Sequence, residues 1–214
     1  MIAMRRHWRS GGLVVVATLV AALGCVRDRV EPPPGVLTVS VEQQASWVRN
    51  FNPLTTATAP RWPTQAGIYE PLYVFNSVRG EQVPWLATGY AWRDDYRVLR
   101  VTTRTGVRWS DGQPFTAADV AFTFNLLKQV PALDRRGLWS FLGAVTVVDD
   151  TTVDFAFSRR FLPGLDDVLV QLIVPAHVWK TVADPIAFAN ETPVATGPFT
   201  EVRVFRNQIY ELGR

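Results

Sequence analysis

The chain has 214 residues, 48% of them hydrophobic, which is long enough for one or two domains and apolar enough for a packed core. Its formal net charge of +3 equals the charge of three arginines, Arg5, Arg6 and Arg9, in a stretch without acidic residues. The remainder of the chain is therefore formally neutral, and we expect no nucleic-acid partner.

Residues 1–24 have the features of a signal peptide. A basic region, Arg5–Arg9, precedes the apolar run Leu13–Ala22, which is shorter than the roughly 20 residues needed to span a membrane. The only cysteine of the chain, Cys25, follows the small residue Gly24, and this position favours lipidation of Cys25 after cleavage. An ordinary signal peptide cut after Gly24 is the alternative. Both interpretations predict export, and the first places the protein on the extracytoplasmic face of the cell membrane through a lipid anchor.

The next part of the chain predicts a tether, a strand and a long loop. Residues 25–35 contain Pro32-Pro33-Pro34 and are expected to form a stiff tether that lifts the following domain off the membrane. Alternating apolar and polar residues predict a first strand at Val36–Val41. Residues 43–61 have few periodic apolar positions, and long loops of this kind are often functional. A helix is expected at Pro63–Tyr69.

The remaining chain predicts antiparallel hairpins. Asp94-Asp95-Tyr96 and Asp149-Asp150-Thr151-Thr152 are turn sequences between alternating apolar stretches. A short helix is expected at Pro163–Leu172. The predicted strand pairs are Gly89–Arg93 with Val98–Arg104, Ala144–Val148 with Val153–Phe157, and Phe199–Phe205 with Gln208–Leu212. This pattern predicts an α+β fold that is rich in antiparallel strands.

The stretch Gly106–Leu127 predicts a strand, a tight turn and a capped helix in succession. Asp111-Gly112 tolerates the positive φ of such a turn, and Pro114 fixes the exit from it. Thr116 and Asp119 have the spacing of a capping box, directly ahead of an apolar helical run.

The residue order of this stretch resembles the signature of the bacterial extracellular solute-binding proteins of family 5, the dipeptide- and oligopeptide-binding type that serves ABC importers. Other motifs of that family occur in its order and at about its spacing. They are Asn52-Pro53-Leu54, Tyr69-Glu70-Pro71-Leu72, Pro84-Trp85-Leu86-Ala87, Asp149-Asp150-Thr151-Thr152-Val153, Ile173-Val174-Pro175-Ala176-His177-Val178-Trp179 and Thr196-Gly197-Pro198-Phe199. The ordered set is more specific than any single motif.

The resemblance implies one lobe of a two-lobed periplasmic-binding-protein-like fold of class II, with a mixed sheet and antiparallel hairpins. Family members are much longer than this chain, so residues 36–214 are expected to form an incomplete N-terminal lobe, truncated before the second lobe. The resemblance also implies the substrate-binding component of an ABC importer, with a peptide or oligosaccharide ligand and a membrane permease as partners. It implies no enzymatic activity and no cofactor.

The resemblance also indicates ligand-binding residues. In peptide-binding relatives, the segment after the Asn-Pro turn meets the ligand partly through its backbone, and the matching residues here are Ala57, Thr58 and Ala59. The relatives also have an aromatic side chain in the cleft, and Trp139 or Phe141 lies in the matching region.

Predicted position, together with membership of the family-like motifs for Trp109 and Trp179, divides the tryptophans into two groups. Trp47, Trp62 and Trp139 lie in or beside predicted loops, where their rings can stack on sugar rings or peptide side chains. Four others are expected to be core residues: Trp85, Trp92, Trp109 and Trp179. A flat exposed row of tryptophans would instead suit a stand-alone carbohydrate- or cell-wall-binding surface lipoprotein, which is the alternative function.

Catalysis and metal binding have little support in the sequence. His177 is the only histidine outside the signal peptide, and we expect it to cap or pack a corner beside Pro175. No Cys–His pair, nucleophile elbow or phosphate-binding glycine loop is present. The acidic pairs Asp94-Asp95 and Asp149-Asp150 fall in predicted turns, where aspartate serves the backbone. We therefore expect neither an enzyme nor a metal site.

Overall fold

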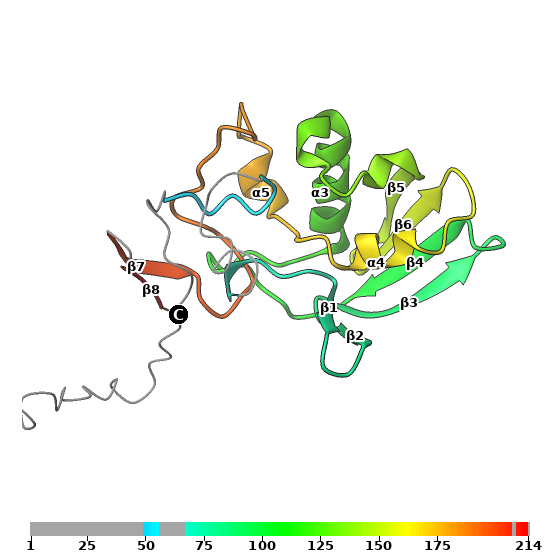
Figure 1. Ribbon diagram of the computed structural model, residues 1–214, viewed down its shortest axis with the longest axis horizontal. Coiled ribbons are helices and arrows are strands. Elements are labelled where there is room, and N and C mark those ends of the chain that lie inside the picture. Colours follow the sequence, from blue (N-terminus) through cyan, green and yellow to red (C-terminus); the bar gives the residue numbers. More distant parts are fainter. Residues whose placement is uncertain (1–48, 56–66, 207–208, 214) are drawn as a thin grey trace, which may run out of the picture. The chain divides into compact units, whose positions relative to one another are not determined.

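The largest sheet of the protein has four strands in the order β3-β4-β6-β5 (Figure 1). The computed structural model describes residues 49–55, 67–206 and 209–213, all within one compact unit, Gln43–Arg214. The strands of the sheet are β3 Ala87–Arg93, β4 Val98–Thr103, β5 Leu142–Asp149 and β6 Thr152–Phe157. Every neighbouring pair is antiparallel, so the two hairpins predicted here are confirmed.

Aspartates shape both turns of this sheet. Between β5 and β6, the Asp149 carboxylate accepts hydrogen bonds from the backbone N–H and the hydroxyl of Thr151, at 2.8 and 2.9 Å. These hydrogen bonds hold the pKa of Asp149 below its ordinary value. Between β3 and β4, Asp94, Asp95 and Tyr96 have φ angles of 48°, 56° and 61°. Aspartate tolerates this left-handed region better than tyrosine does.

Helix α3, Ala117–Gln129, packs on the sheet against β5 and β6 (Figure 1). The predicted capping box is confirmed, because the Thr116 hydroxyl accepts the Ala118 N–H at 3.3 Å and the Asp119 carboxylate accepts the Thr116 N–H at 3.0 Å. Phe124 of the helix meets Phe155 of β6 edge to face, with ring centroids 4.8 Å apart. Such a pair adds about 1 kcal/mol to the stabilisation that comes from buried area.

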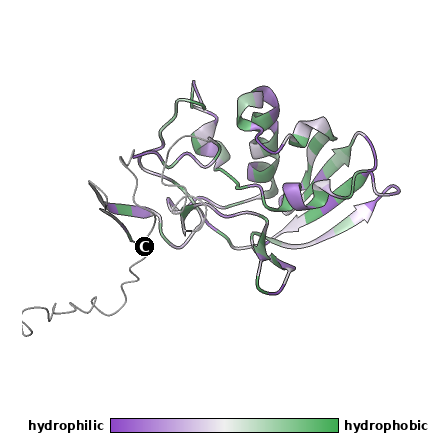
Figure 2. Ribbon diagram, viewed as in Figure 1, coloured by the Kyte–Doolittle hydropathy of each residue, from purple (hydrophilic) through white to green (hydrophobic). Residues whose placement is uncertain are grey.

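The two faces of the sheet differ in chemistry. Four fully buried side chains lie on the face that carries Phe155: Leu99, Val101, Val153 and Phe155 itself. On the other face the cross-strand neighbours Arg100 and Asp154 form a bidentate ion pair, with N–O distances of 2.7 and 2.6 Å. Figure 2 shows hydrophobic residues on β5 and β6, interrupted by hydrophilic ones, and hydrophilic residues at the β3–β4 turn. This alternation is the period-two pattern of the sequence.

The helix predicted at Pro163–Leu172 is confirmed only in part, because α4 spans Gly164–Leu169. Leu172 leaves the helix and forms an isolated antiparallel bridge with Pro71. Gly164 is required at the start of α4, since a Cβ there would lie 2.6 Å from Cε2 of Phe141. Helix α5 spans Ala176–Trp179, and short 3-10 helices, η2 and η3, span Pro131–Leu133 and Leu138–Ser140.

Two further antiparallel hairpins form two-stranded sheets. The predicted C-terminal hairpin is confirmed as β7 Glu201–Arg206 and β8 Ile209–Gly213. The hairpin of β1 Tyr73–Asn76 and β2 Glu81–Pro84 was not predicted. The predicted strand Val36–Val41 and most of the predicted helix Pro63–Tyr69 lie outside the described residues. Within the described ranges, no helix is long and apolar enough to cross a membrane.

The four tryptophans that we expected in the core have different outcomes. Trp109 and Trp179 are 2% and 1% exposed, which confirms the prediction for both. Trp92 is half-buried and packs against the core. The prediction for Trp85 is wrong, because its side chain is 45% exposed and its indole N–H donates to the Glu70 carboxylate at the surface, at 2.7 Å.

Candidate ligand-binding site

The predicted ligand segment Ala57–Ala59 lies outside the described residues, as do Trp47, Trp62 and Cys25. The structure does describe the chain on both sides of that segment, at residues 49–55 and from residue 67 onward.

The Asn-Pro turn holds the N-terminal flank. Asn52 is only 3% exposed, and its side-chain N–H groups donate to the carbonyls of Pro185 and Phe188, each at 2.9 Å. Its side-chain oxygen accepts the backbone N–H of Leu54 at 2.9 Å and closes the turn. One buried amide therefore ties this flank to a segment more than a hundred residues away, since Asn52 and Pro185 are 133 positions apart.

A close approach of two backbones holds the C-terminal flank. The N–H of Gly197 donates to the carbonyl of Ile68 at 2.9 Å, and the N–H of Phe199 donates to the carbonyl of Gly67 at 2.8 Å. A Cβ at position 197 would lie 2.3 Å from the Ile68 carbonyl oxygen and 2.8 Å from that of Gly67. Only glycine permits this approach, which explains the glycine of the Thr196-Gly197-Pro198-Phe199 motif.

Asn190 connects the two flanks. It is 4% exposed, and its side-chain N–H group donates to the Tyr69 hydroxyl at 2.6 Å and to the Phe51 carbonyl at 3.4 Å. The Phe51 N–H donates to the carbonyl of Ala189 at 2.8 Å. Burial raises the pKa of the Tyr69 hydroxyl far above its ordinary value, so this group stays neutral. We call residues 51–54, 67–69, 185–190 and 197–199 the anchoring frame.

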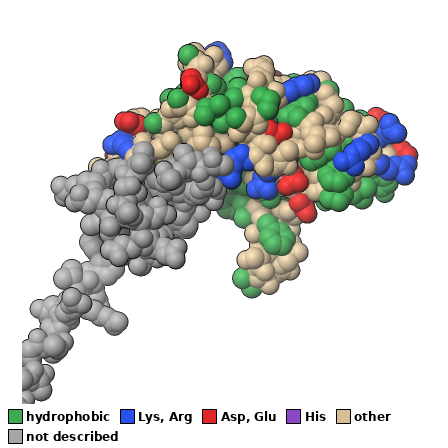
Figure 3. Space-filling view, turned by 45° about the horizontal axis from the view of Figure 1, so that its top comes forward, with side chains coloured by type: hydrophobic (Ala, Val, Ile, Leu, Met, Phe, Trp, Pro, Cys, Tyr) green, Lys and Arg blue, Asp and Glu red, His purple; other side chains and the backbone are tan. Residues whose placement is uncertain are grey.

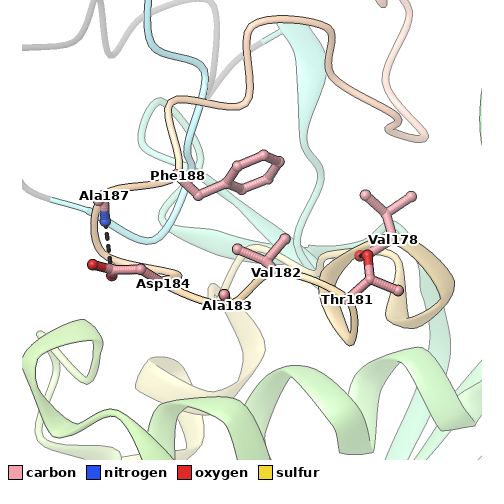
Figure 4. Close-up of a pocket in the computed structure, with 7 residues that line it drawn as sticks. All are labelled: Val178, Thr181, Val182, Ala183, Asp184, Ala187 and Phe188. Carbon is pink, nitrogen blue, oxygen red and sulfur yellow. Dashed lines mark hydrogen bonds between the residues drawn. The ribbon is translucent and has the colours of Figure 1, made fainter.

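An open hollow with a volume of about 530 Å³ adjoins the anchoring frame at Phe188, formed by α5 and the loop that follows it (Figure 4). Its wall is mainly apolar, with Val178 and Val182 beside Phe188. The Asp184 carboxylate is engaged at the rim, where it accepts the N–H of Ala187 at 3.1 Å. The hollow therefore suits an apolar group better than an ion.

Trp139 and Phe141, the predicted aromatic candidates, differ in exposure. Trp139 is half-buried, its indole N–H donates to the Phe124 carbonyl at 2.8 Å, and Nζ of Lys128 lies 4.3 Å from its ring centroid. Phe141 is 3% exposed and stacks on Phe157, with centroids 5.4 Å apart. Trp139 thus keeps part of its surface exposed, whereas Phe141 is buried. The ligand roles of both residues stay predictions.

His177 packs a corner beside Pro175, as predicted. Its Nε2 lies 2.7 Å from Oδ2 of Asp111, and its ring meets that of Trp109, with centroids 6.5 Å apart. Partial burial raises the pKa of Asp111, but hydrogen bonds from His177 and the Gln113 N–H outweigh it and leave the pKa below its ordinary value. In the part of the chain that the structure describes, no three His, Cys, Asp or Glu side chains gather in a way that could hold a metal.

The family model for bacterial extracellular solute-binding proteins, family 5 (middle region), matches residues 81–213. The chain belongs to this family. Because the family binds solutes, the expectation that the protein is not an enzyme is confirmed.

Individual relatives match most of the chain. A putative ABC transporter peptide-binding protein of Brucella ovis is 27% identical over 170 residues, which cover 76% of this chain and 31% of the relative. The dipeptide-binding protein of Escherichia coli is 27% identical over 174 residues, covering 70% of this chain and 32% of the relative.

The structural comparison agrees. The mannohexaose-bound periplasmic oligopeptide-binding protein of Thermotoga maritima superposes with a TM-score of 0.68 and 34% identity, covering 73% of this chain and 29% of that protein. The predicted α+β fold, as part of a solute-binding-protein fold, is thus confirmed. The chain spans about a third of the length of the relatives that it matches.

Proposed function

We propose that this protein is the substrate-binding component of an ABC importer, with a peptide or an oligosaccharide as its ligand. Family membership supports the class. The Brucella ovis and Escherichia coli relatives are named for peptides, and the Thermotoga maritima relative is bound to mannohexaose, so both ligand classes belong to the proposal. The protein delivers its ligand to a membrane permease, and the lipid anchor at Cys25 holds it at the extracytoplasmic face of the membrane.

The observation that carries the site is the anchoring of both flanks of the predicted ligand segment by one frame. In this proposal Ala57–Ala59 pairs with an extended ligand through backbone hydrogen bonds, in the manner of an added strand. Two hydroxyls adjoining the frame, those of Thr55 and Thr196, are buried and have no hydrogen-bond partner among the described residues. Buried hydroxyls are usually bonded, so these two are available to a ligand or a bridging water. The rings of Trp47, Trp62 and Trp139 supply stacking surface.

The first test is the affinity of this chain alone. We propose that a second lobe, outside these residues, completes the cleft, because the chain spans about a third of its relatives. One lobe offers half the contact surface, yet the full entropic cost of immobilising the ligand remains. Calorimetry with a panel of peptides and cello-oligosaccharides should therefore show dissociation constants no tighter than about millimolar, near −4 kcal/mol. A micromolar ligand would contradict the incomplete cleft.

The second test concerns the backbone of the ligand segment in a two-lobed protein that carries this lobe. Thr58→Pro removes one backbone N–H donor, whereas the matched control Thr58→Ala removes the side chain and keeps that donor. We expect Thr58→Ala to bind like the parent and Thr58→Pro to lose about 1 kcal/mol, or about fivefold in affinity. Equal affinities for the two variants would rule out backbone pairing at residue 58.

The alternative, a stand-alone carbohydrate- or cell-wall-binding lipoprotein, has less support. Trp109 and Trp179 are buried, and the indole N–H of Trp139 is bonded to the backbone of α3. Trp109 and Trp179 therefore cannot belong to a flat exposed row. The proposed importer function is consistent with the anchoring frame and with membership of the solute-binding family.

A further inference from the structure

The turn end of the β3–β4 hairpin carries a cluster of arginines. Arg93 and Arg97 flank the turn, and Arg159 and Arg160 follow β6. The two segments lie side by side. Nε of Arg160 donates to the Asp95 carbonyl at 3.0 Å, and the N–H of Phe157, the last residue of β6, donates to the Arg97 carbonyl at 2.7 Å. Figure 3 shows basic side chains gathered at one end of the described surface. We call residues 93–97 and 159–162 the arginine tip.

The arginine tip has an excess of positive charge. Its four arginines face only two aspartates, Asp94 and Asp95, which leaves a formal excess of two positive charges. Arg160 forms an ion pair with Asp95. Within the described residues, the guanidinium groups of Arg93 and Arg97 have neither an ion-pair partner nor a hydrogen-bond partner. These two free cations lie on either side of the turn and suit an anionic partner.

Apolar side chains lie among these charges. Tyr96 and Leu162 are 47% and 51% exposed, and the guanidinium carbon of Arg159 lies 4.6 Å from the ring centroid of Phe161. Tyr96 keeps an aromatic ring at a φ of 61°, in a region that a bulky side chain adopts at a cost and glycine adopts freely. A strained conformation kept at an exposed position indicates a binding function for the side chain.

We propose that the arginine tip binds the surface of an anionic phospholipid membrane. Guanidinium groups pair with phosphate oxygens in a bidentate manner, and basic residues near a membrane are attracted to anionic headgroups. Tyrosine is enriched at the headgroup level, because its ring is apolar and its hydroxyl is polar. An acidic protein surface would account for the arginines and would leave Tyr96 and Leu162 without a role. The inference rests on the chemistry of the tip and does not depend on the transported ligand.

Co-sedimentation of the full chain with lipid vesicles tests this proposal. Vesicles of phosphatidylglycerol mixed with phosphatidylcholine are compared with pure phosphatidylcholine vesicles, at low and high salt. The double variant Arg93→Ser/Arg97→Ser removes the two free charges. The control Arg79→Ser/Arg136→Ser removes the same charge from other exposed positions, and Tyr96→Gly removes the ring while relieving the backbone. The N-terminal apolar run is identical in all variants, so differences between them report on the tip.

We expect the full chain to bind anionic vesicles more tightly than neutral ones, and to lose this preference at high salt. The tip double variant should bind anionic vesicles on the order of twentyfold more weakly, at about fivefold for each arginine. Tyr96→Gly should weaken binding while the melting temperature is unchanged or higher. Equal losses in the tip and control variants, or no preference for anionic lipid, would overturn the proposal. Binding to soluble polyglutamate as tight as to anionic vesicles would assign the tip to an acidic protein instead.

Discussion

Replacing Asn52 by alanine tests whether the anchoring frame holds the start of the predicted ligand segment. The change removes two donated hydrogen bonds, to the carbonyls of Pro185 and Phe188, and one accepted from the N–H of Leu54. Each bond contributes about 1 kcal/mol net, so we expect a loss of about 3 kcal/mol in the free energy of unfolding. Carbonyls left buried without a partner increase the loss, and water entering the space reduces it.

Urea denaturation followed by circular dichroism measures this loss by linear extrapolation. At about 2–4 °C per kcal/mol for a domain of this size, the melting temperature should fall by roughly 6–12 °C. The matched control is Asn50→Ala. Among the described residues, the Asn50 side chain accepts one N–H, that of Asn52 at 2.9 Å, and its loss should cost about 1 kcal/mol. If Asn52→Ala costs no more than Asn50→Ala, the side chain of Asn52 does not anchor the frame.

Two further changes test other parts of the molecule. Gly197→Ala should lower the free energy of unfolding by about 2–3 kcal/mol, because its Cβ would lie 2.3 Å from the Ile68 carbonyl oxygen. The control Gly89→Ala should change the free energy of unfolding little, because a Cβ there has no neighbour within 4 Å. Equal effects of the two changes in denaturation would refute the close approach. Asp111 is stabilised in its ionised form by His177, so its contribution is present above about pH 4 and is lost as the pH falls through its lowered pKa. Asp111→Asn should therefore make the melting temperature less dependent on pH between about pH 4 and pH 2, and an unchanged acid dependence would show that the pair does not contribute.

Contacts between residues that are close in the sequence could be predicted, and contacts between residues that are distant in the sequence could not. Thr116 and Asp119 are three residues apart, so their capping box follows from spacing alone. The same Asp119 carboxylate also accepts the N–H of Ala176 at 2.9 Å and the indole N–H of Trp109 at 3.3 Å. Those bonds depend on how segments that are distant in the sequence pack together, and residue spacing does not show this packing.

The errors have a similar cause. Strand periodicity shows which residues share a face, but it does not show which face another element covers. The predicted core position of Trp85 is therefore wrong, and this residue is 45% exposed.

The β1–β2 hairpin has a turn signal in the sequence. Asn76 accepts the N–H groups of Val78 and Arg79 with its side chain, and Gly80 adopts a φ of 68°. An asparagine and a glycine at this spacing are a turn signature.

The Asn-Pro and Thr-Gly-Pro motifs were separate features of the sequence, and the structure joins them as two sides of one frame. Most of the hydrogen bonds described for that frame end on backbone groups, such as the carbonyls of Pro185, Phe188 and Ile68, although Asn190 also donates to the Tyr69 hydroxyl. Backbone acceptors are present whatever side chains the chain carries, so we expect the frame to tolerate different sequences at residues 56–66. Relatives with peptide names and a relative bound to mannohexaose are what such a division predicts. We therefore propose that ligand choice changes in the segment while the fold around it stays the same.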